Sequence, residues 1–193
     1  MNIKNQINSN MDEYQQKVLV VDDQPETIYV ITLTLKNLNV KILSASNGKE
    51  AIEKAETEQP DMIILDIQMP IMDGFEACEI LKKNEKTKNI PIMFLTSKFT
   101  EIKSKVKGLD MGADDYLLKP FEPLELASRV KVMLRLRDAQ MRLEQKNRHY
   151  MEMLGFISHE LKNPLTSILG CAETLKNGIV GALGPDQQKF IEI

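Results

Sequence analysis

Short apolar runs alternate with amphipathic stretches between Lys17 and about Phe121. The runs are VLVV (18–21), VKILSAS (40–46), MIILDI (62–67), PIMFLT (91–96) and DYLL (115–118). Near-continuous Val, Ile and Leu are typical of strands that are buried on both faces. The intervening stretches show helical spacing, and they lie near 25–37, 48–58, 73–84, 101–111 and 122–137. This alternation predicts an α/β fold with a five-stranded, doubly wound parallel sheet and helices on both faces.

The composition of the sequence changes after Pro123. No Gly or Pro occurs between 124 and 154, and good helix formers dominate there, so a helix is expected to run past the edge of the α/β domain. Apolar residues recur every seven positions and then in steps of three and four, and they are Leu136, Leu143, Tyr150, Leu154, Ile157, Leu161, Leu165, Ile168, Ala172 and Leu175. This heptad seam predicts a partner helix. Its extra four-residue step falls across LKNPL, where Pro164 favours a kink.

The end of the chain has the signals of a helix turn. Asn177 and Gly178 form an expected C-cap, GIVGALG (178–184) an expected loop, and Pro185 the first turn of another helix.

Composition and charge narrow the functional classes. The net charge of -3 gives no general attraction to nucleic acid. Residues 124–150 hold seven Lys/Arg against three Asp/Glu, but without interleaved aromatic residues this stretch is interpreted as the solvated flank of a coiled coil. Cys78 and Cys171 lack the spacing of metal ligands and are expected to be reduced thiols. The polar N-terminus is no signal peptide, and the apolar runs are too short for a membrane span, so a cytoplasmic protein is expected.

Three acidic residues follow or end predicted strands. Asp22 and Asp23 come after the first run, and Asp66 lies near the end of the third. Parallel strands end at one edge of the sheet, so these carboxylates are expected to be neighbours that repel one another. A hard divalent cation with oxygen ligands, most plausibly Mg²⁺, would offset that repulsion.

Two further strand ends carry groups that suit an anion. Thr96 offers a hydroxyl and Lys119 a positive charge. Acids, a metal ion, a hydroxyl and a lysine together indicate phosphoryl transfer to a carboxylate.

The motifs VLVVDDQP, MIILDIQMPIMDGFEA, PIMFLTS and GADDYLLKPF resemble, in order and spacing, the receiver domain of two-component response regulators. The resemblance covers roughly residues 16–137. It implies that Asp66 is the phosphoacceptor and that Asp22 and Asp23 are the acidic pair. Mg²⁺ would be held by Asp23, Asp66 and the backbone carbonyl of Gln68, with Asp22 acting through water.

The same resemblance assigns further residues. It implies that Thr96 and Lys119 contact the phosphoryl group, that Tyr116 is the aromatic switch residue, and that the Lys119–Pro120 bond is cis. Gly74 fits a position that needs unusual backbone freedom.

His159 lies two residues from both Ile157 and Leu161, roughly opposite the seam, so it is not a core histidine. Glu160 follows it and Asn163 lies one turn further on its face. From these residues alone, a chemical role and a merely exposed histidine are equally compatible with the pattern.

The segment FISHELKNPLTSILGCAETL closely resembles the H-box of sensor histidine kinases, in the dimerisation and phosphoacceptor hairpin. The resemblance implies that His159 is autophosphorylated, that Glu160 is its acid/base partner and that Asn163 assists phosphotransfer or phosphatase chemistry. His149 matches nothing in the motif and is interpreted as a surface residue. The resemblance covers about 148–193 and implies a homodimer through the connecting and phosphoacceptor helices.

The expected organisation is a disordered N-terminus (1–15), a receiver core (16–123), its last helix continuing as a coiled-coil linker (124–147), and a partial phosphoacceptor domain (148–193). The leading interpretation is a receiver-regulated histidine kinase, with Asp66 phosphorylated by an upstream histidine kinase or phosphotransfer protein. ATP would act only through a catalytic domain that this chain lacks, so we expect a fragment of a longer hybrid kinase, because neither a P-loop nor a Gly-rich nucleotide segment occurs. The alternative is a non-enzymatic phosphorelay module that passes phosphoryl groups between Asp66 and histidines.

Overall fold

The computed structural model describes residues 15–97 and 112–177 together with Gly181 and Gly184. The chain divides into two compact units, Met1–Ala139 and Gln140–Ile193, and each is described by itself. The expected helix near 101–111, most of the expected N-terminal disorder and nearly all of the expected loop and second helix after Asn177 lie outside the described residues.

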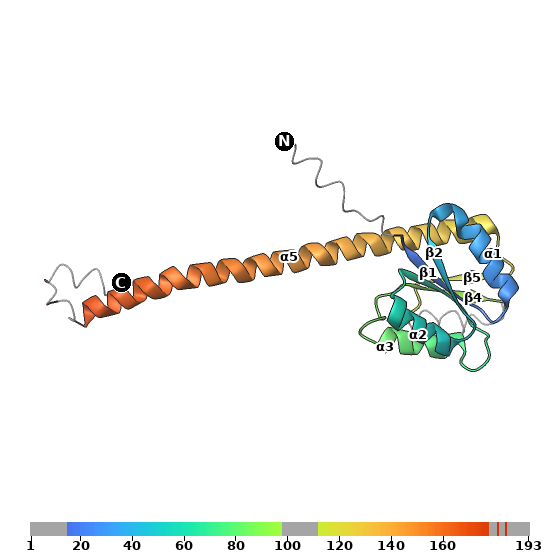
Figure 1. Cartoon of the computed structure of the whole chain (residues 1–193), viewed down its shortest axis with the longest axis horizontal. Coiled ribbons are helices and arrows are strands. Elements are labelled where there is room, and N and C mark those ends of the chain that lie inside the picture. The colour runs from blue at the N-terminus through green and yellow to red at the C-terminus, as the bar shows by residue number, and fades with distance from the viewer. Residues whose placement is uncertain (1–14, 98–111, 178–180, 182–183, 185–193) are drawn as a thin grey trace, which may run out of the picture. The chain divides into compact units, whose positions relative to one another are not determined.

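The first unit contains one parallel sheet (Figure 1). Its strands are β1 (Lys17–Val21), β2 (Lys41–Ala45), β3 (Met62–Asp66), β4 (Ile92–Thr96) and β5 (Asp115–Leu118). Their order across the sheet is β2-β1-β3-β4-β5, and all four neighbouring pairs are parallel. The predicted five-stranded doubly wound sheet is therefore confirmed.

The described helices follow the strands as expected. They are α1 (Pro25–Leu35) with the short 3-10 turn η2 (Lys36–Leu38), α2 (Gly48–Glu58), α3 (Gly74–Lys83) and α5 (Pro123–Lys176). Two of them begin at a side-chain cap, because Asn47 accepts a hydrogen bond from the Glu50 N–H and Asp73 accepts one from the Glu76 N–H.

Side-chain alternation along the strands divides the core between the two faces of the sheet. Leu19 and Ile63 point to the face that α2 and α3 cover, whereas Val20 and Ile64 point to the face that α1 and the first turns of α5 cover (Figure 1). All four side chains are fully buried. Because both faces are covered, the strands carry apolar residues at nearly every position.

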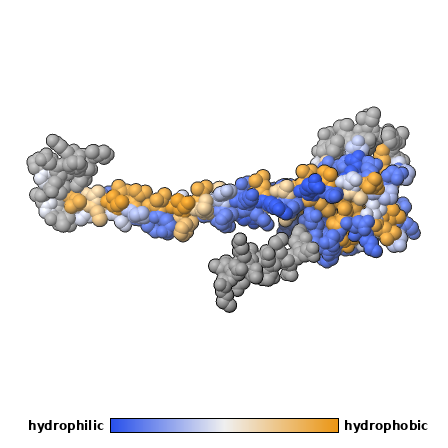
Figure 2. All heavy atoms as spheres, turned by 90° about the horizontal axis from the view of Figure 1, so that it is seen from above, coloured by the Kyte–Doolittle hydropathy of each residue, from blue (hydrophilic) through white to orange (hydrophobic). Residues whose placement is uncertain are grey.

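Helix α5 spans 54 residues and continues through Pro164. Its buried residues are confined to the first turns, at Leu126, Val130, Met133 and Leu134. Further along, large apolar side chains lie at the surface, and Figure 2 shows them gathered along the C-terminal part of the helix. The kink expected at Pro164 stays a prediction. Within the described residues, no helix combines the length and the apolar character that a membrane span requires.

Candidate functional site

The carboxyl edge of the sheet brings together the polar residues predicted from the strand ends. Asp22 and Asp23 follow β1, Asp66 is the last residue of β3, Thr96 is the last of β4, and Lys119 follows β5. Since β1, β3, β4 and β5 are successive neighbours in a parallel sheet, these ends meet at one edge. The predicted gathering of these residues is therefore what the fold produces.

The acidic residues form a tight cluster that includes a lysine. One carboxylate oxygen from each of Asp22, Asp23 and Asp66 lies within 4.8 Å of the others. Asp22 is fully buried, Asp66 is 6% exposed and Asp23 is exposed. The Lys119 Nζ lies 2.6 Å from Asp22 Oδ2 and 2.9 Å from Asp66 Oδ1. The second oxygen of Asp22 accepts a hydrogen bond from the Gln24 N–H at 2.9 Å.

The electrostatics of this cluster favour a further cation. Burial raises the pKa of Asp66, Lys119 opposes that rise, and the charges of Asp22 and Asp23 add to it. Burial on its own would lower the pKa of Lys119, but its hydrogen bonds to Asp22 and Asp66 outweigh burial and raise that pKa. Three carboxylates face one ammonium group, so negative charge remains in excess. An all-oxygen donor set of this charge fits a hard divalent ion such as Mg²⁺.

Gly74 is required here for a different reason from the one predicted. Its φ is not positive, so backbone freedom is not the cause. A Cβ at this position would lie 2.1 Å from the backbone oxygen of Asp66 and 2.9 Å from the Cα of Ile67. The start of α3 thus packs directly against the backbone of Asp66. The Gly74 N–H donates a hydrogen bond to the Ile67 carbonyl at 2.9 Å. Only a residue without a side chain fits this approach.

Thr96 ends β4 at this edge, whereas Tyr116 is the second residue of β5 and pairs with Phe94. Thr96 and Tyr116 are half-buried, and Tyr116 packs against the core under α2 and α3. The Lys119–Pro120 bond is cis, as predicted. Gln68 is exposed, and its side-chain Oε1 accepts a hydrogen bond from the Ser97 Oγ at 3.4 Å. The sequence reasoning did not consider Ser97, although it directly follows Thr96.

His159 belongs to the second unit and lies on α5. The side chains of His159 and Glu160 are 73% and 58% exposed, and the His159 Nδ1 is 3.8 Å from the Glu160 Oε1. Asn163 is also exposed. The imidazole is therefore accessible, with a carboxylate close to one of its nitrogens.

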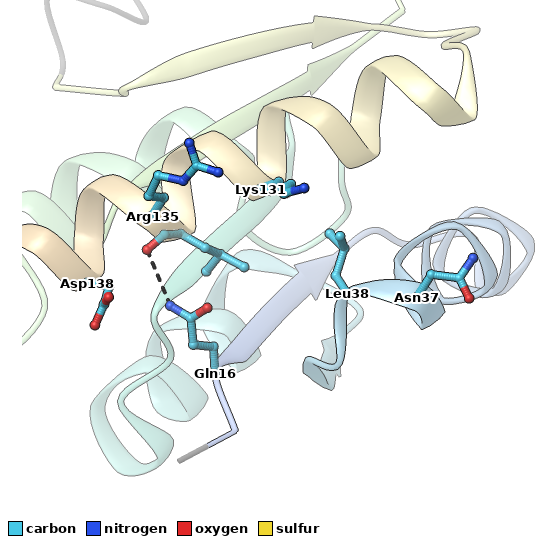
Figure 3. A pocket seen from close by; sticks show the side chains of 7 residues that line it. Gln16, Asn37, Leu38, Lys131, Arg135 and Asp138 are labelled. Atoms are coloured by element: carbon cyan, nitrogen blue, oxygen red, sulfur yellow. Dashed lines mark hydrogen bonds between the residues drawn. The ribbon is translucent and has the colours of Figure 1, made fainter. Parts of the chain in front are cut away.

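The described residues of the first unit line hollows that include the following two. One of about 390 Å³ lies between α5 and η2, where the Gln16 Nε2 donates to the Leu134 carbonyl at 3.3 Å (Figure 3). It is at the amino end of β1, opposite the acidic cluster, and contains no predicted functional residue. The other, of about 310 Å³, is lined by Glu26, Thr27, Val30, Lys119, Pro120 and Phe121. Of these two hollows, the second adjoins the acidic cluster, through Lys119.

Two family models match the chain. The response regulator receiver domain matches residues 18–131, and the His Kinase A (phospho-acceptor) domain matches residues 151–193. The first match contains the acidic cluster and Lys119, and the second contains His159.

Curated relatives resemble the first part of the chain. The alkaline phosphatase synthesis transcriptional regulatory protein PhoP of Bacillus subtilis is 44% identical over 120 residues, which cover 62% of this chain and 49% of PhoP. The DNA-binding response regulator MtrA of Mycolicibacterium smegmatis is 37% identical over 125 residues, covering 65% of this chain and 53% of MtrA. The chain thus spans about half the length of these relatives.

Solved structures agree with this match. A putative response regulator from Chloroflexus aurantiacus is 36% identical with a TM-score of 0.59, covering 63% of this chain and 98% of that one. The receiver domain of a signal transduction histidine kinase from Syntrophus aciditrophicus is 33% identical with a TM-score of 0.58, covering 62% and 90%. The chain therefore belongs to the response regulator receiver family, and a histidine kinase phospho-acceptor domain follows its receiver.

Proposed function

We propose that Mg²⁺-dependent phosphorylation of Asp66 regulates a histidine kinase that is autophosphorylated on His159. A receiver and a phospho-acceptor domain in one chain are the parts of two-component phosphorelay signalling. The observation that carries the proposal is the contact of Lys119 with Asp22 and Asp66 inside a cluster of three carboxylates.

The metal would be held at the exposed side of this cluster. Asp23, Asp66 and the backbone carbonyl of Gln68 are the proposed ligands, and Asp22 would act through water. The engagement of both Asp22 oxygens, by Lys119 and by the Gln24 N–H, supports this indirect role. When bound, Mg²⁺ would neutralise charge on the phosphoryl oxygens.

Side chains of the protein would carry out the phosphoryl transfer itself. A carboxylate oxygen of Asp66 attacks phosphorus as the donor's bond to phosphorus breaks, which forms an acyl phosphate. Lys119, already in contact with Asp66, would move to a phosphoryl oxygen, and the Thr96 hydroxyl would donate to another. Tyr116, half-buried against the core, would report the change as the switch residue.

A protein phosphodonor is supported by the surface beside Lys119. The hollow there is lined mainly by apolar groups, and α1 next to it exposes Tyr29 by 64%, Val30 by 45% and Leu33 by 52%. Exposed apolar surface of this kind marks a protein interaction site. An upstream histidine kinase or phosphotransfer protein is the proposed partner.

In the second unit, His159 would accept phosphate from ATP, delivered by a catalytic domain outside this chain. Glu160 would serve as its acid/base partner, and Asn163 would assist the transfer. The contact between His159 and Glu160 supports this assignment.

We also place both domains in the cytoplasm, where thiols such as the free Cys78 and Cys171 stay reduced.

The apolar seam of α5 supports a homodimer. Leu143, Leu154 and Leu161 are 60%, 54% and 58% exposed, which a lone helix in water would not sustain without a partner. We propose a receiver core over 16–123, a coiled-coil linker over 124–147 and a partial phosphoacceptor domain over 148–193.

The coupling between the two sites is tested with the full-length protein. Phosphodonor and Mg²⁺ should change the extent of His159 phosphorylation in the wild type and leave it unchanged in Asp66→Asn. An equal response in both proteins would contradict regulation through Asp66.

A second candidate is a non-enzymatic relay in which Asp66 and His159 only pass phosphoryl groups. It is favoured by the names of the curated relatives, which are regulators rather than kinases. Incubating the full-length protein with ATP distinguishes the two, because only the kinase labels His159.

A further inference from the structure

The apolar seam of α5 is interrupted by two polar side chains within the second unit. Its positions follow one another in alternating steps of three and four, and they are Gln140, Leu143, Asn147, Tyr150, Leu154, Ile157 and Leu161. In a heptad a step of three leads from an a to a d position, so Gln140 and Asn147 occupy a positions. The d positions between them are apolar and exposed, Leu143 by 60% and Tyr150 by 58%. Two amides therefore stand where a coiled coil normally places apolar groups.

The two amides differ in their hydrogen bonds. The Gln140 Nε2 donates to the Glu144 Oε1 at 3.0 Å, one turn further along the same helix. Asn147 is exposed, and its side chain has no hydrogen-bond partner among the residues that the structure describes. Gln140 thus has a partner within its own helix, whereas the Asn147 amide is available to a group outside it.

A second copy of the chain in one particular arrangement would satisfy this amide. In a parallel dimer of equal register the symmetry axis runs between the two helices, so Asn147 faces Asn147 of the partner subunit. An amide carries both donor and acceptor groups, and one side chain can donate its N–H to the oxygen of the other. A shifted or antiparallel pairing would bury the amide against apolar side chains without a partner, which weakens association.

We propose that Asn147 sets the parallel, in-register pairing of α5 with α5 of a second copy of the chain, through an amide–amide hydrogen bond at the dimer axis. This inference rests on the proposed homodimer and adds its orientation and register. A single polar residue at an a position specifies register in coiled coils, at a cost in stability. Because His159 follows on the same helix, alignment at Asn147 also aligns the two His159 side chains along the dimer axis.

Opposite charges at position 147 test whether the two residues face each other. Asn147→Asp and Asn147→Lys are each made in the full-length protein. Either variant alone should dimerise at least about tenfold more weakly than the wild type, because like charges would meet inside the seam. When the two variants are mixed, opposite charges meet instead, and the heterodimer should exceed the share expected from random pairing. Native mass spectrometry separates the three dimers by mass.

Two further comparisons isolate the role of the amide. Gln145 is exposed and lies two residues before Asn147, at an f position on the outer side of the seam, so Gln145→Asp and Gln145→Lys should pair at random. Asn147→Leu should dimerise about tenfold more tightly than the wild type, because an apolar a position needs no hydrogen-bond partner.

The outcomes separate this inference from the proposal beneath it. Random pairing of the charged variants at position 147, or an Asn147→Leu protein that associates no more tightly than the wild type, would overturn the role of Asn147. Monomeric wild-type protein would instead overturn the proposed homodimer.

Discussion

At the scale of single residues, the acidic edge combines burial with crowded negative charge. Asp66 lies in a nearly buried position beside two other carboxylates, and Lys119 only partly offsets them. Burial and charge repulsion thus lower the folding stability of the receiver at the residue where phosphorylation is proposed.

Replacing Asp66 by Asn should stabilise the receiver at neutral pH without metal. Burial raises the pKa of Asp66 above 3.8, so its contribution to stability is fully present below pH 3.8 and is lost as the pH rises through the raised value. At pH 7 the Asn variant should be more stable than the wild type in EDTA, and its advantage should shrink towards pH 3.8. Hydrogen exchange of sheet amides measures this free energy of unfolding. A less stable Asn variant at pH 7 in EDTA would contradict the account.

Replacing Gly74 by Ala should destabilise the receiver. The new Cβ would collide with the backbone of Asp66, which must shift, at a cost of at least about 2 kcal/mol. Urea unfolding, monitored by hydrogen exchange of the sheet amides, measures this loss of unfolding free energy. Gly155→Ala is the control, since nothing lies within 4 Å of its added Cβ and it should stabilise α5. Equal stability of the Gly74 variant and the wild type would show that the close approach does not exist.

The residue patterns anticipated some of these features and not others. Asp22, Asp23, Asp66 and Lys119 could be brought together from sequence because parallel strands end at one edge. The reason for Gly74 could not, because a contact between the start of α3 and the strand end before it is a matter of distance rather than of pattern. The contact of Ser97 with Gln68 could not be predicted, because the sequence does not show which side chain a serine after a strand will contact.

At the scale of elements, burial on both faces made the strands easy to predict. The predicted run 62–67 differs from β3 (Met62–Asp66) by one residue, and α2 begins and ends as expected. The sequence predicts a last helix that runs past the α/β domain, and it predicts a C-cap at Asn177 and Gly178. The structure has a single α5 from Pro123 to Lys176.

The start of α2 provides a pH-dependent test. A hydrogen bond from Lys54, then one from the Ser46 N–H, lowers the pKa of Glu50 from 4.5 to about 2. Because the side chain is 36% exposed, solvent screening limits its contribution, and Glu50→Gln should cost about 0.5 kcal/mol at pH 7. The lowered pKa means that this contribution is present above pH 4.5 and is lost as the pH falls towards about 2. Thermal unfolding against pH measures it, with Glu53→Gln as the control on the exposed face of α2. A pH-independent difference would count against the ion pair.

At the scale of the whole molecule, two sets of exposed groups call for partners. The receiver offers an apolar surface on α1 beside Lys119, and α5 offers its seam. The sequence predicted the seam through its spacing, but the surface on α1 appears only when the helix and Phe121 are placed together.

The seam predicts that Leu154→Lys will convert a dimer into a monomer. A charged side chain at a seam position would have to be buried without a partner, which weakens association by at least tenfold. Sedimentation equilibrium of the full-length protein measures the change. Glu152→Lys, two residues away and off the seam, should leave the dimer intact. Monomeric wild-type protein, or dimers in both variants, would contradict the seam as the interface.

The central claim is that Asp66 is the phosphoacceptor of a Mg²⁺-dependent receiver, and one measurement tests it most directly. The chain is incubated with labelled acetyl phosphate and Mg²⁺, and acyl phosphate and phosphohistidine are mapped separately by their different stabilities in acid and base. The account predicts acyl phosphate on Asp66 in the wild type and none in EDTA or in Asp66→Asn. Absence of phosphate from Asp66 in the wild type, or undiminished acyl phosphate in the Asn variant, would contradict it.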